Sequence, residues 1–310
     1  MIDLLDRQDL KKQPLELRRI CEKIFSKGKE IRPQLVVLVS KYLGLKKSKQ
    51  LFLARLVEYI HNSSLLHDDF IDQSKRRHNS KTAWLEFSPT QAILVGDYLL
   101  AKVIIYLAQE KNLELLTQTA QVICNLAQGE FLQRQFLDFK NKSFHQRNQV
   151  SELKTASLFK WCLKAPFIYK NRKSKKLYSI LDKIGYYMGL LFQRSDDLID
   201  FNIRNKDNKS YLVDIKESYF NSFSCFLLKQ SNSKQEEALK NLSSLSSIYK
   251  IFSDFDDQVK AFDSLNKKLI LKVEKILEQE LKPLLKQSEK NLVVELKKRI
   301  SFFYWRNNKE

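Results

Sequence analysis

The stretch LLHDDFID, residues 65–72, is the most informative part of this chain about its fold and its chemistry. It ends a long apolar segment, and its D-D-x-x-D pattern returns as DDLID at residues 196–200. On a helix, Asp68 and Asp72 share one face, and so do Asp196 and Asp200. Two such faces opposed would gather six carboxylates, which repel one another unless cations lie between them. The pattern therefore predicts a site for divalent cations, and clustered oxygen ligands suit Mg²⁺ better than zinc or copper.

The charge of the acidic stretches sets the expected number of ions. Six carboxylates carry about six negative charges, which about three Mg²⁺ ions would cancel. An anionic ligand of those ions would then still need cationic side chains from the protein. The predicted metal ligands are Asp68, Asp69, Asp72, Asp196, Asp197 and Asp200.

Residues that break secondary structure are scarce. The 310 residues include 6 Gly and 5 Pro, and 43% are apolar. Helical periodicity recurs along the chain, whereas strand-like alternation is rare. We therefore expect an all-α fold in a single domain, residues 1–310, with short joints between long helices. The clearest expected helices lie near residues 49–72, 89–110, 112–139 and 177–200.

The chain is strongly basic, with 55 Lys and Arg against 36 Asp and Glu, a formal charge of +19. Three interpretations compete: nucleic-acid binding, attraction to anionic lipid or substrate, and a solvated basic surface that binds nothing in particular. The last is favoured for most of these lysines. Because no zinc-finger spacing, basic heptad region or RNA-binding aromatic signature is present, we expect no nucleic-acid partner.

The cysteine spacing and the N-terminal sequence indicate the cellular compartment of the protein. Cys21, Cys124, Cys162 and Cys225 are far apart and form no C-x-x-C pair, as expected for reduced thiols. The charged N-terminus leads into no secretory apolar region, and no uninterrupted apolar run approaches about 18 residues. We expect a cytoplasmic protein without a membrane span.

Six further motifs accompany the two acidic stretches in a fixed order. They are GKEIRP at 28–33, EYIH at 58–61, GDYLL at 96–100, QGE at 128–130, KTA at 154–156 and FQRSDD at 192–197. With them, the chain resembles the trans-isoprenyl diphosphate synthases, the polyprenyl synthetase family, over roughly residues 25–225. The resemblance implies an isoprenoid-synthase-type helical bundle around a central cavity, usually in a homodimer.

The resemblance also implies a reaction. Mg²⁺ held by both acidic stretches binds the diphosphate of an allylic substrate, which ionises to an allylic cation. Isopentenyl diphosphate then attacks through its double bond, a proton is lost, and a longer trans-polyprenyl diphosphate forms. The catalytic residues implied are Asp68, Asp69, Asp72, Lys154, Asp196 and Asp197. The substrate-binding residues implied are Lys29, Arg32, His61 and Arg77 for isopentenyl diphosphate, Lys154, Thr155, Gln193 and Lys209 on the allylic side, and Arg76 without a substrate assigned.

The resemblance implies that side-chain size in the turn before the first acidic stretch limits the length of the product. In this family, bulky aromatic residues there close the tail cavity, whereas this chain has Ser63 and Ser64. We expect a long-chain product, and a peripheral membrane contact for product release is left open.

Two motifs depart from the family pattern. The usual Arg-Arg-Gly after the first acidic stretch lacks its Gly, and the usual D-L-x-E-G-K-x-T after the second is DIKESYFN at 214–221. Tyr219 therefore stands in place of a lysine. The alternatives are a non-catalytic or weakly active partner subunit, a short-chain synthase making farnesyl or geranylgeranyl diphosphate, a terpene-synthase-like enzyme and a basic nucleic-acid-binding protein.

Overall fold

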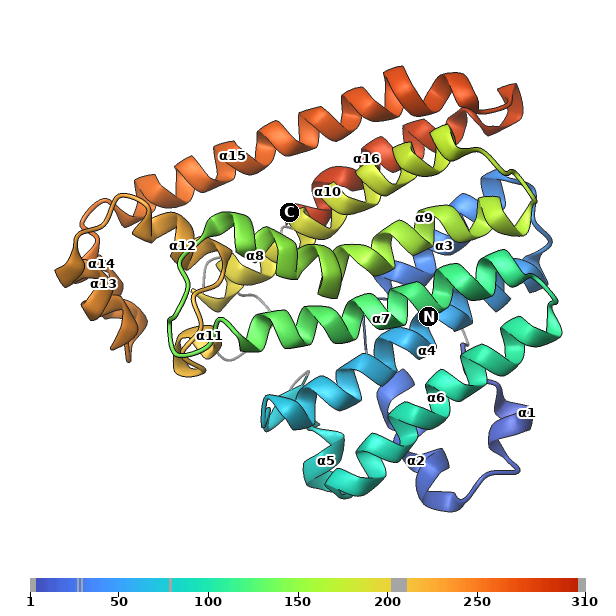
Figure 1. Ribbon diagram of the computed structural model, residues 1–310, viewed down its shortest axis with the longest axis horizontal. Coiled ribbons are helices and arrows are strands. Elements are labelled where there is room, and N and C mark those ends of the chain that lie inside the picture. The colour runs from blue at the N-terminus through green and yellow to red at the C-terminus, as the bar shows by residue number, and fades with distance from the viewer. Residues whose placement is uncertain (1–3, 27, 29, 78–79, 202–210, 306–310) are drawn as a thin grey trace. The chain divides into compact units, whose positions relative to one another are not determined.

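The computed structural model describes residues 4–26, 28, 30–77, 80–201 and 211–305, and most of them are helical (Figure 1). The chain divides into two compact units, Met1–Ile123 with Trp161–Lys175 and Cys124–Lys160 with Lys176–Glu310. The helical content confirms the expected all-α class, while the single-domain expectation stays a prediction.

Unit 1 is built around two long helices, α4 and α6. The strands pair as a short antiparallel hairpin, with Arg76 opposite Lys81 and Arg77 opposite Ser80. The elements of the unit are α1 (Arg7–Leu10), α2 (Leu15–Phe25), α3 (Ile31–Tyr42), α4 (Lys47–Ile71), β1 (Arg76–Arg77), β2 (Ser80–Lys81), α5 (Ala83–Glu86) and α6 (Pro89–Gln109). Helices α7 (Leu113–Arg134) and α9 (Ser157–Tyr169) each run from one unit into the other.

Helix α4 forms because apolar side chains recur every three or four residues along it. Leu53, Leu56, Val57 and Ile60 have no exposed surface, and the helix packs against α3 and α6. Gln73, at a φ of +52°, ends the run. The last turns of α4 thus hold the first acidic stretch on a rigid, buried support.

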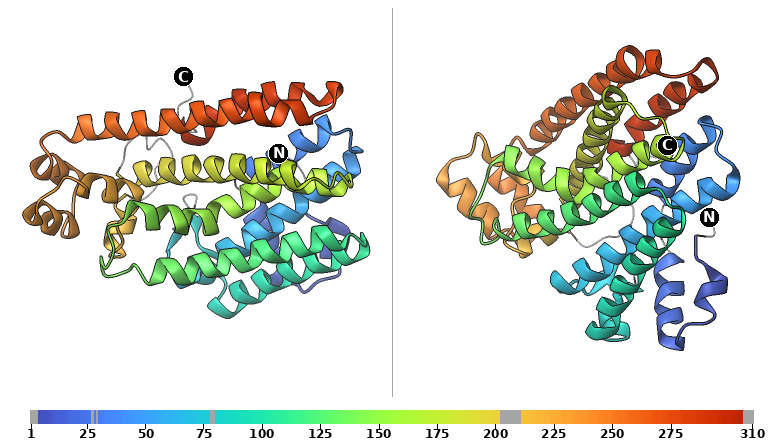
Figure 2. Two further views of the ribbon diagram at one scale, coloured as in Figure 1. Left: turned by 45° about the horizontal axis from the view of Figure 1, so that its top comes forward. Right: turned by 45° about the vertical axis from the view of Figure 1, so that its right-hand side comes forward.

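Helix α6 lies alongside α4 in all three views (Figures 1 and 2). Ser88 caps its start by accepting a hydrogen bond from the Gln91 amide at 3.1 Å, and Pro89 occupies the first helical position. Among the described residues, α6 is the one helix long and apolar enough to cross a membrane, a test that core helices of soluble proteins also pass.

Unit 2 contains the second acidic stretch, at the end of α10. Its elements are α8 (Phe144–Ser151), the π-helical turn η1 (Glu152–Ala156), α10 (Lys175–Asp200), α11 (Val213–Lys216), α12 (Ser222–Leu228), α13 (Ser233–Lys240), η2 (Leu245–Ser247), α14 (Ile248–Ile251), α15 (Phe255–Ile276), η3 (Leu277–Leu281), η4 (Lys282–Leu284), η5 (Gln287–Glu289) and α16 (Asn291–Trp305).

Two glycines let α10 approach its neighbours closely. A Cβ on Gly189 would lie 2.3 Å from the Ala156 Cα, and one on Gly185 would lie 2.6 Å from the Lys160 backbone. Only glycine fits at such distances. The contact at Gly189 brings η1, which carries Lys154 and Thr155, against the turn of α10 that precedes the acidic stretch.

Candidate active site

The first acidic stretch divides into one buried and two half-buried carboxylates. Asp69 is 5% exposed and accepts three hydrogen bonds from the Arg77 guanidinium, at 2.6 to 3.0 Å. Asp68 and Asp72 are half-buried, and the Asp72 amide closes the helix by donating to the Asp68 carbonyl at 2.8 Å. Asp69 is therefore bound to the protein's own arginine, while the other two retain a solvent-facing part.

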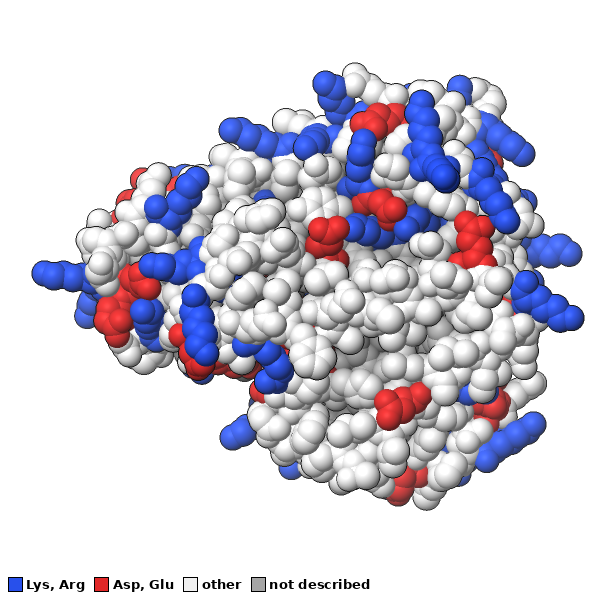
Figure 3. Space-filling view, viewed as in Figure 1, with Lys and Arg blue, Asp and Glu red and all other residues white. Residues whose placement is uncertain are grey.

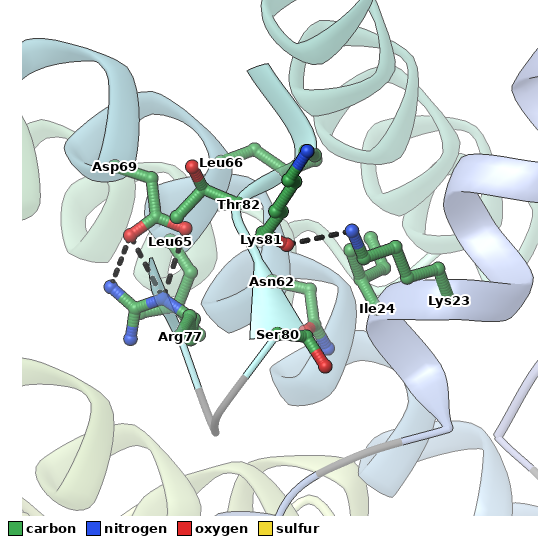
Figure 4. Close-up of a pocket in the computed structure, with 11 residues that line it drawn as sticks. Lys23, Ile24, Asn62, Leu65, Leu66, Asp69, Arg77, Ser80, Lys81 and Thr82 are labelled. Carbon is green, nitrogen blue, oxygen red and sulfur yellow. Dashed lines mark hydrogen bonds and ion pairs between the residues drawn. The ribbon is translucent and has the colours of Figure 1, made fainter. Parts of the chain in front are cut away.

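The hairpin after α4 holds Arg77 in place. The Thr82 hydroxyl and the Trp84 indole both donate to the Ser74 carbonyl, at 2.7 and 2.9 Å, which ties the base of the hairpin. Arg77 bonds directly to Asp69, and both side chains line a hollow of about 60 Å³ (Figure 4). Lys23 of α2 closes another side by donating to the Lys81 carbonyl at 2.7 Å. The hollow has room for a few waters only.

Arg32 and His61 meet although 29 residues separate them. The Arg32 Nη1 lies 3.1 Å from the His61 Nε2, and because a guanidinium only donates, that ring nitrogen must accept. Arg32 is 8% exposed; burial lowers its pKa, while the nearby charge of buried Glu58 acts to raise it. Burial likewise raises the pKa of Glu58, whose carboxylate accepts from the Asn62 amide at 3.1 Å.

Two residues of the GKEIRP motif adopt positive φ angles. Gly28 has a φ of +141°, a conformation that favours glycine, and the left-handed Glu30 precedes α3. Arg32 thus enters the core from the first turn of α3. Lys29, predicted to contact substrate, lies outside the described residues. Arg76, on β1, is exposed.

The two serines of the expected tail cavity are both hydrogen-bonded to backbone. Ser63 is buried and donates to the Gly96 carbonyl of α6 at 2.9 Å, and Ser64 donates to the His61 carbonyl at 2.9 Å. A Cβ on Gly96 would lie 2.3 Å from the His67 Nε2, so this glycine lets His67 lie across α6. Neither serine side chain adds bulk at this turn of α4.

The second acidic stretch is held by backbone and side-chain donors that follow it in the sequence. Asp197, 4% exposed, accepts from the Ser222 amide at 3.0 Å and from the Ser222 hydroxyl. Asp200, 9% exposed, accepts from the amides of Val213 at 2.7 Å and Asp214 at 3.3 Å. Asp196 is half-buried. Asp196 therefore keeps a solvent-facing part, and Asp197 and Asp200 are buried.

Burial of these carboxylates raises their pKa values. The pKa of Asp200 rises to about 6, mainly by desolvation, and the amides of Val213 and Asp214 act in the opposite direction. Desolvation also raises the pKa of Asp197 and of Asp214, and the charges of Asp200 and Asp197 add to the rise at Asp214. Asn221 offsets part of this cost by donating to Asp214 at 2.8 Å. Burial and mutual repulsion thus act together on these three carboxyls.

Thr155 and Gln193 form a relay to Asp197. The Thr155 hydroxyl donates to the Gln193 Oε1 at 2.8 Å, and the Gln193 Nε2 donates to the Asp197 carboxylate at 3.0 Å. Lys154 is bound to Glu130 and lies 3.1 Å from the Gln133 side-chain oxygen. The sequence predicted Lys154, Thr155 and Gln193 together.

Several residues that hold the site were not predicted. Glu130 belongs to the QGE motif at 128–130, but the sequence alone does not predict its ion pair with Lys154. Asn221 and Ser222 lie in the departing segment; Asn221 caps α12 by accepting from the amides of Phe223 and Ser224. An Asn before a short apolar helix was the available signal.

Tyr219, which replaces the expected lysine, is buried. Its ring stacks on the Arg147 guanidinium at 4.2 Å and belongs to a core cluster with Phe136. Arg147 also donates to the Asn141 carbonyl at 2.6 Å. Lys216 donates to the Tyr211 carbonyl at 3.0 Å. Lys209, predicted on the allylic side, lies outside the described residues.

Within the described ranges, no three His, Cys, Asp or Glu side chains gather as a ready-made metal-ligand group. The donor chemistry nevertheless fits a hard divalent cation, since both acidic stretches offer carboxylate oxygens at helix ends and no thiolate or imidazole set. Asp68, Asp72 and Asp196 are the members that combine partial exposure with this chemistry.

Comparison with known proteins settles the family. Residues 14–251 match the family described as Polyprenyl synthetase. The chain belongs to the polyprenyl synthetase family. Among its polyprenyl synthetase relatives, the geranylfarnesyl diphosphate synthase of Methanosarcina mazei is 31% identical over 242 residues, covering 77% of this chain and 75% of that protein.

Long-chain enzymes are also among the polyprenyl synthetase relatives. The octaprenyl diphosphate synthase of Haemophilus influenzae is 34% identical over 175 residues, 56% of this chain and 53% of that protein. The chain thus spans about half the length of that relative. A polyprenyl synthase from Caulobacter crescentus CB15, solved with calcium and isoprenyl diphosphate, shares the fold at a TM-score of 0.82 and 22% identity, covering 97% of this chain and 92% of that one.

Proposed function

We propose that this chain is a Mg²⁺-dependent trans-prenyltransferase that condenses isopentenyl diphosphate with an allylic diphosphate to give a long-chain polyprenyl diphosphate. The observation that carries the proposal is the pair of acidic helix ends on α4 and α10, each with at least one buried aspartate and at least one half-buried aspartate. Family membership supports it.

The carboxylates divide into two roles. Asp68, Asp72 and Asp196 would hold the Mg²⁺ ions, about three in number. Mg²⁺ held there would neutralise the charge that develops on a departing pyrophosphate. Asp69 orients Arg77, and Asp197 fixes the end of α10 against the start of α12. The buried members therefore preset the geometry of the half-buried ones.

Cationic side chains bind the two diphosphates. Arg32, Arg77 and Arg76 serve isopentenyl diphosphate, because guanidinium groups pair with phosphate oxygens in a bidentate way. Lys154 serves the allylic diphosphate, and Glu130 holds its ammonium until substrate binds. Thr155 and Gln193 orient Asp197 beside it. No side chain acts as a covalent nucleophile.

Product length follows from the turn of α4 that carries Ser63 and Ser64. Both hydroxyls are turned to backbone carbonyls, so this turn presents little bulk to a growing tail. The long-chain relative supports a long product.

A second candidate, a non-catalytic partner subunit, is favoured by one observation. Tyr219 buries an aromatic ring on Arg147 where the family pattern has a lysine. In that case the purified chain would show no turnover alone, yet would raise the rate of a related synthase.

We also propose a homodimer formed through α6. Leu94, Ile104 and Ile105 are 60%, 51% and 45% exposed on this helix, and Figure 3 shows few charged side chains over this part of the surface. Its one lysine, Lys102, forms an ion pair with Asp9 at 2.9 Å. In a chain of charge +19, a helix face without exposed cations is suited to contact a second copy of the chain.

We further propose a reducing, cytoplasmic location, which the four free cysteines support.

The test is incubation of the purified protein with labelled isopentenyl diphosphate, farnesyl diphosphate and Mg²⁺, followed by product sizing. We expect products much longer than geranylgeranyl diphosphate and none after chelation of the metal. A product that stops at geranylgeranyl length would refute the long-chain assignment, and turnover that persists without divalent metal would refute the function.

A further inference from the structure

Three connections of unit 1 meet at the end of the unit where α4 begins. They join α3 to α4, α6 to α7 and α9 to α10, and they lie together in Figure 1 and in both views of Figure 2. Glu110 links them by accepting from the Lys49 ammonium and from the Tyr169 hydroxyl, each at 2.6 Å. Lys173 adds an ion pair to Glu114 at 3.7 Å.

This end of unit 1, the basic end, is far more cationic than the chain as a whole. It comprises residues 41–49, 110–114 and 164–175, which hold ten Lys and Arg against two Glu, compared with 55 against 36 in the whole chain. Both glutamates are engaged in the contacts just described. The opposite end of α4 carries the acidic stretch. Helix α4 therefore runs from a basic end to an acidic one.

An apolar side chain stands among these cations. Leu113, the first residue of α7, is 75% exposed and follows the exposed Lys111 by two residues in the sequence. An exposed leucine at an end of the unit that is rich in lysine suits a phospholipid surface, where the cations meet headgroups and the leucine meets acyl chains. A nucleic acid would use the charges but not the leucine.

The direction of α4 links this end to the active site. Twenty-one residues separate Lys47 from Asp68, about 32 Å along the helix. A prenyl tail that starts at Asp68 and extends past Ser64 would run toward the basic end. On the premise of the proposed function, we propose that the basic end docks on an anionic phospholipid bilayer and delivers the tail of the product into it.

The test is co-sedimentation with vesicles, without substrates. Wild type should bind vesicles containing phosphatidylglycerol and not pure phosphatidylcholine, with binding that weakens as salt rises. Three neutral substitutions at the basic end, Lys46→Gln, Lys47→Gln and Lys170→Gln, should lower the partition coefficient about 100-fold, since each lysine near such a surface contributes about 1 kcal/mol.

A matched control removes as many charges elsewhere. Lys267→Gln, Lys268→Gln and Lys272→Gln neutralise three exposed lysines on α15, where Leu271 is 64% exposed. This variant should bind vesicles within about threefold of wild type. An equal loss in both variants would show a general charge effect and overturn the proposal, as would binding to RNA of equal charge density in preference to vesicles.

A label at Leu113 tests insertion directly. In a Cys124→Ser background, the remaining native thiols are buried, so Leu113→Cys accepts an environment-sensitive fluorophore selectively. Its emission should rise on anionic vesicles, and unchanged emission would refute insertion. Because neither readout needs turnover, vesicle binding without catalysis refutes the proposed function alone, and catalysis without vesicle binding refutes the docking surface alone.

Discussion

The division of the first acidic stretch into a half-buried and a buried carboxylate predicts opposite phenotypes for two adjacent substitutions. Asp68→Ala should lower kcat by at least about 100-fold, because it removes a carboxylate proposed to hold the Mg²⁺ ions that bind the diphosphate. Asp69→Ala should instead reduce stability and weaken the binding of isopentenyl diphosphate, because it deprives Arg77 of its partner.

The magnitude for Asp69→Ala follows from the exposure of the pair. Its side chain is 7% exposed and that of Arg77 is 38% exposed. Hydrogen bonds to charged groups contribute about 1.5–3 kcal/mol, and water reaching Arg77 favours the lower half of that range. A loss of about 2 kcal/mol lowers Tm by roughly 4–8 °C. A loss of about 1.4 kcal/mol in binding would raise KM tenfold.

The assay combines thermal unfolding with steady-state kinetics on both variants, with Arg77→Ala and the double variant completing a mutant cycle. The two single substitutions should be non-additive in Tm, because they break the same contact. The reasoning is wrong if Asp69→Ala keeps the wild-type Tm and KM, or if the effects of Asp69→Ala and Arg77→Ala simply add.

Three further substitutions follow from close contacts. Gly189→Val should cost about 3 kcal/mol in urea unfolding, because its Cβ would overlap the Ala156 backbone. Tyr219→Lys should destabilise by about 2 kcal/mol in the same assay without raising kcat, because it sets a second cation against buried Arg147; a gain in activity would contradict this. Ser64→Phe should shorten the product on chromatographic sizing while leaving Tm within about 2 °C, and an unchanged product would exclude this turn as the length determinant.

The long helices were predictable because their apolar periodicity is uninterrupted. The expected helices near 49–72 and 177–200 correspond to α4 and α10, and both end in their acidic stretch as predicted. The helix expected near 112–139 ends early, at Arg134. Asp138 and Phe139 adopt positive φ values, and the Phe139 amide donates to the Ser218 carbonyl at 2.9 Å. That tertiary contact overrides local periodicity.

The chemistry-bearing residues were recognisable by type, but their roles were not. D-D-x-x-D indicates carboxylates on one face, whereas the pairing of Asp69 with Arg77 depends on a hairpin that no periodicity predicts. The π-helical turn that presents Lys154 and Thr155 has no sequence signature either, although such turns are frequent at functional sites. Contacts among distant residues, not local pattern, decide which carboxylate faces solvent.

The central claim is that both acidic helix ends hold the divalent ions that bind a diphosphate. Calorimetric titration of inorganic pyrophosphate into the protein tests it most directly, with and without Mg²⁺, for wild type, Asp68→Ala and Asp196→Ala. We predict Mg²⁺-dependent binding by wild type that either substitution weakens at least about tenfold. Binding of equal strength in all three proteins, or binding that does not need Mg²⁺, would contradict the claim.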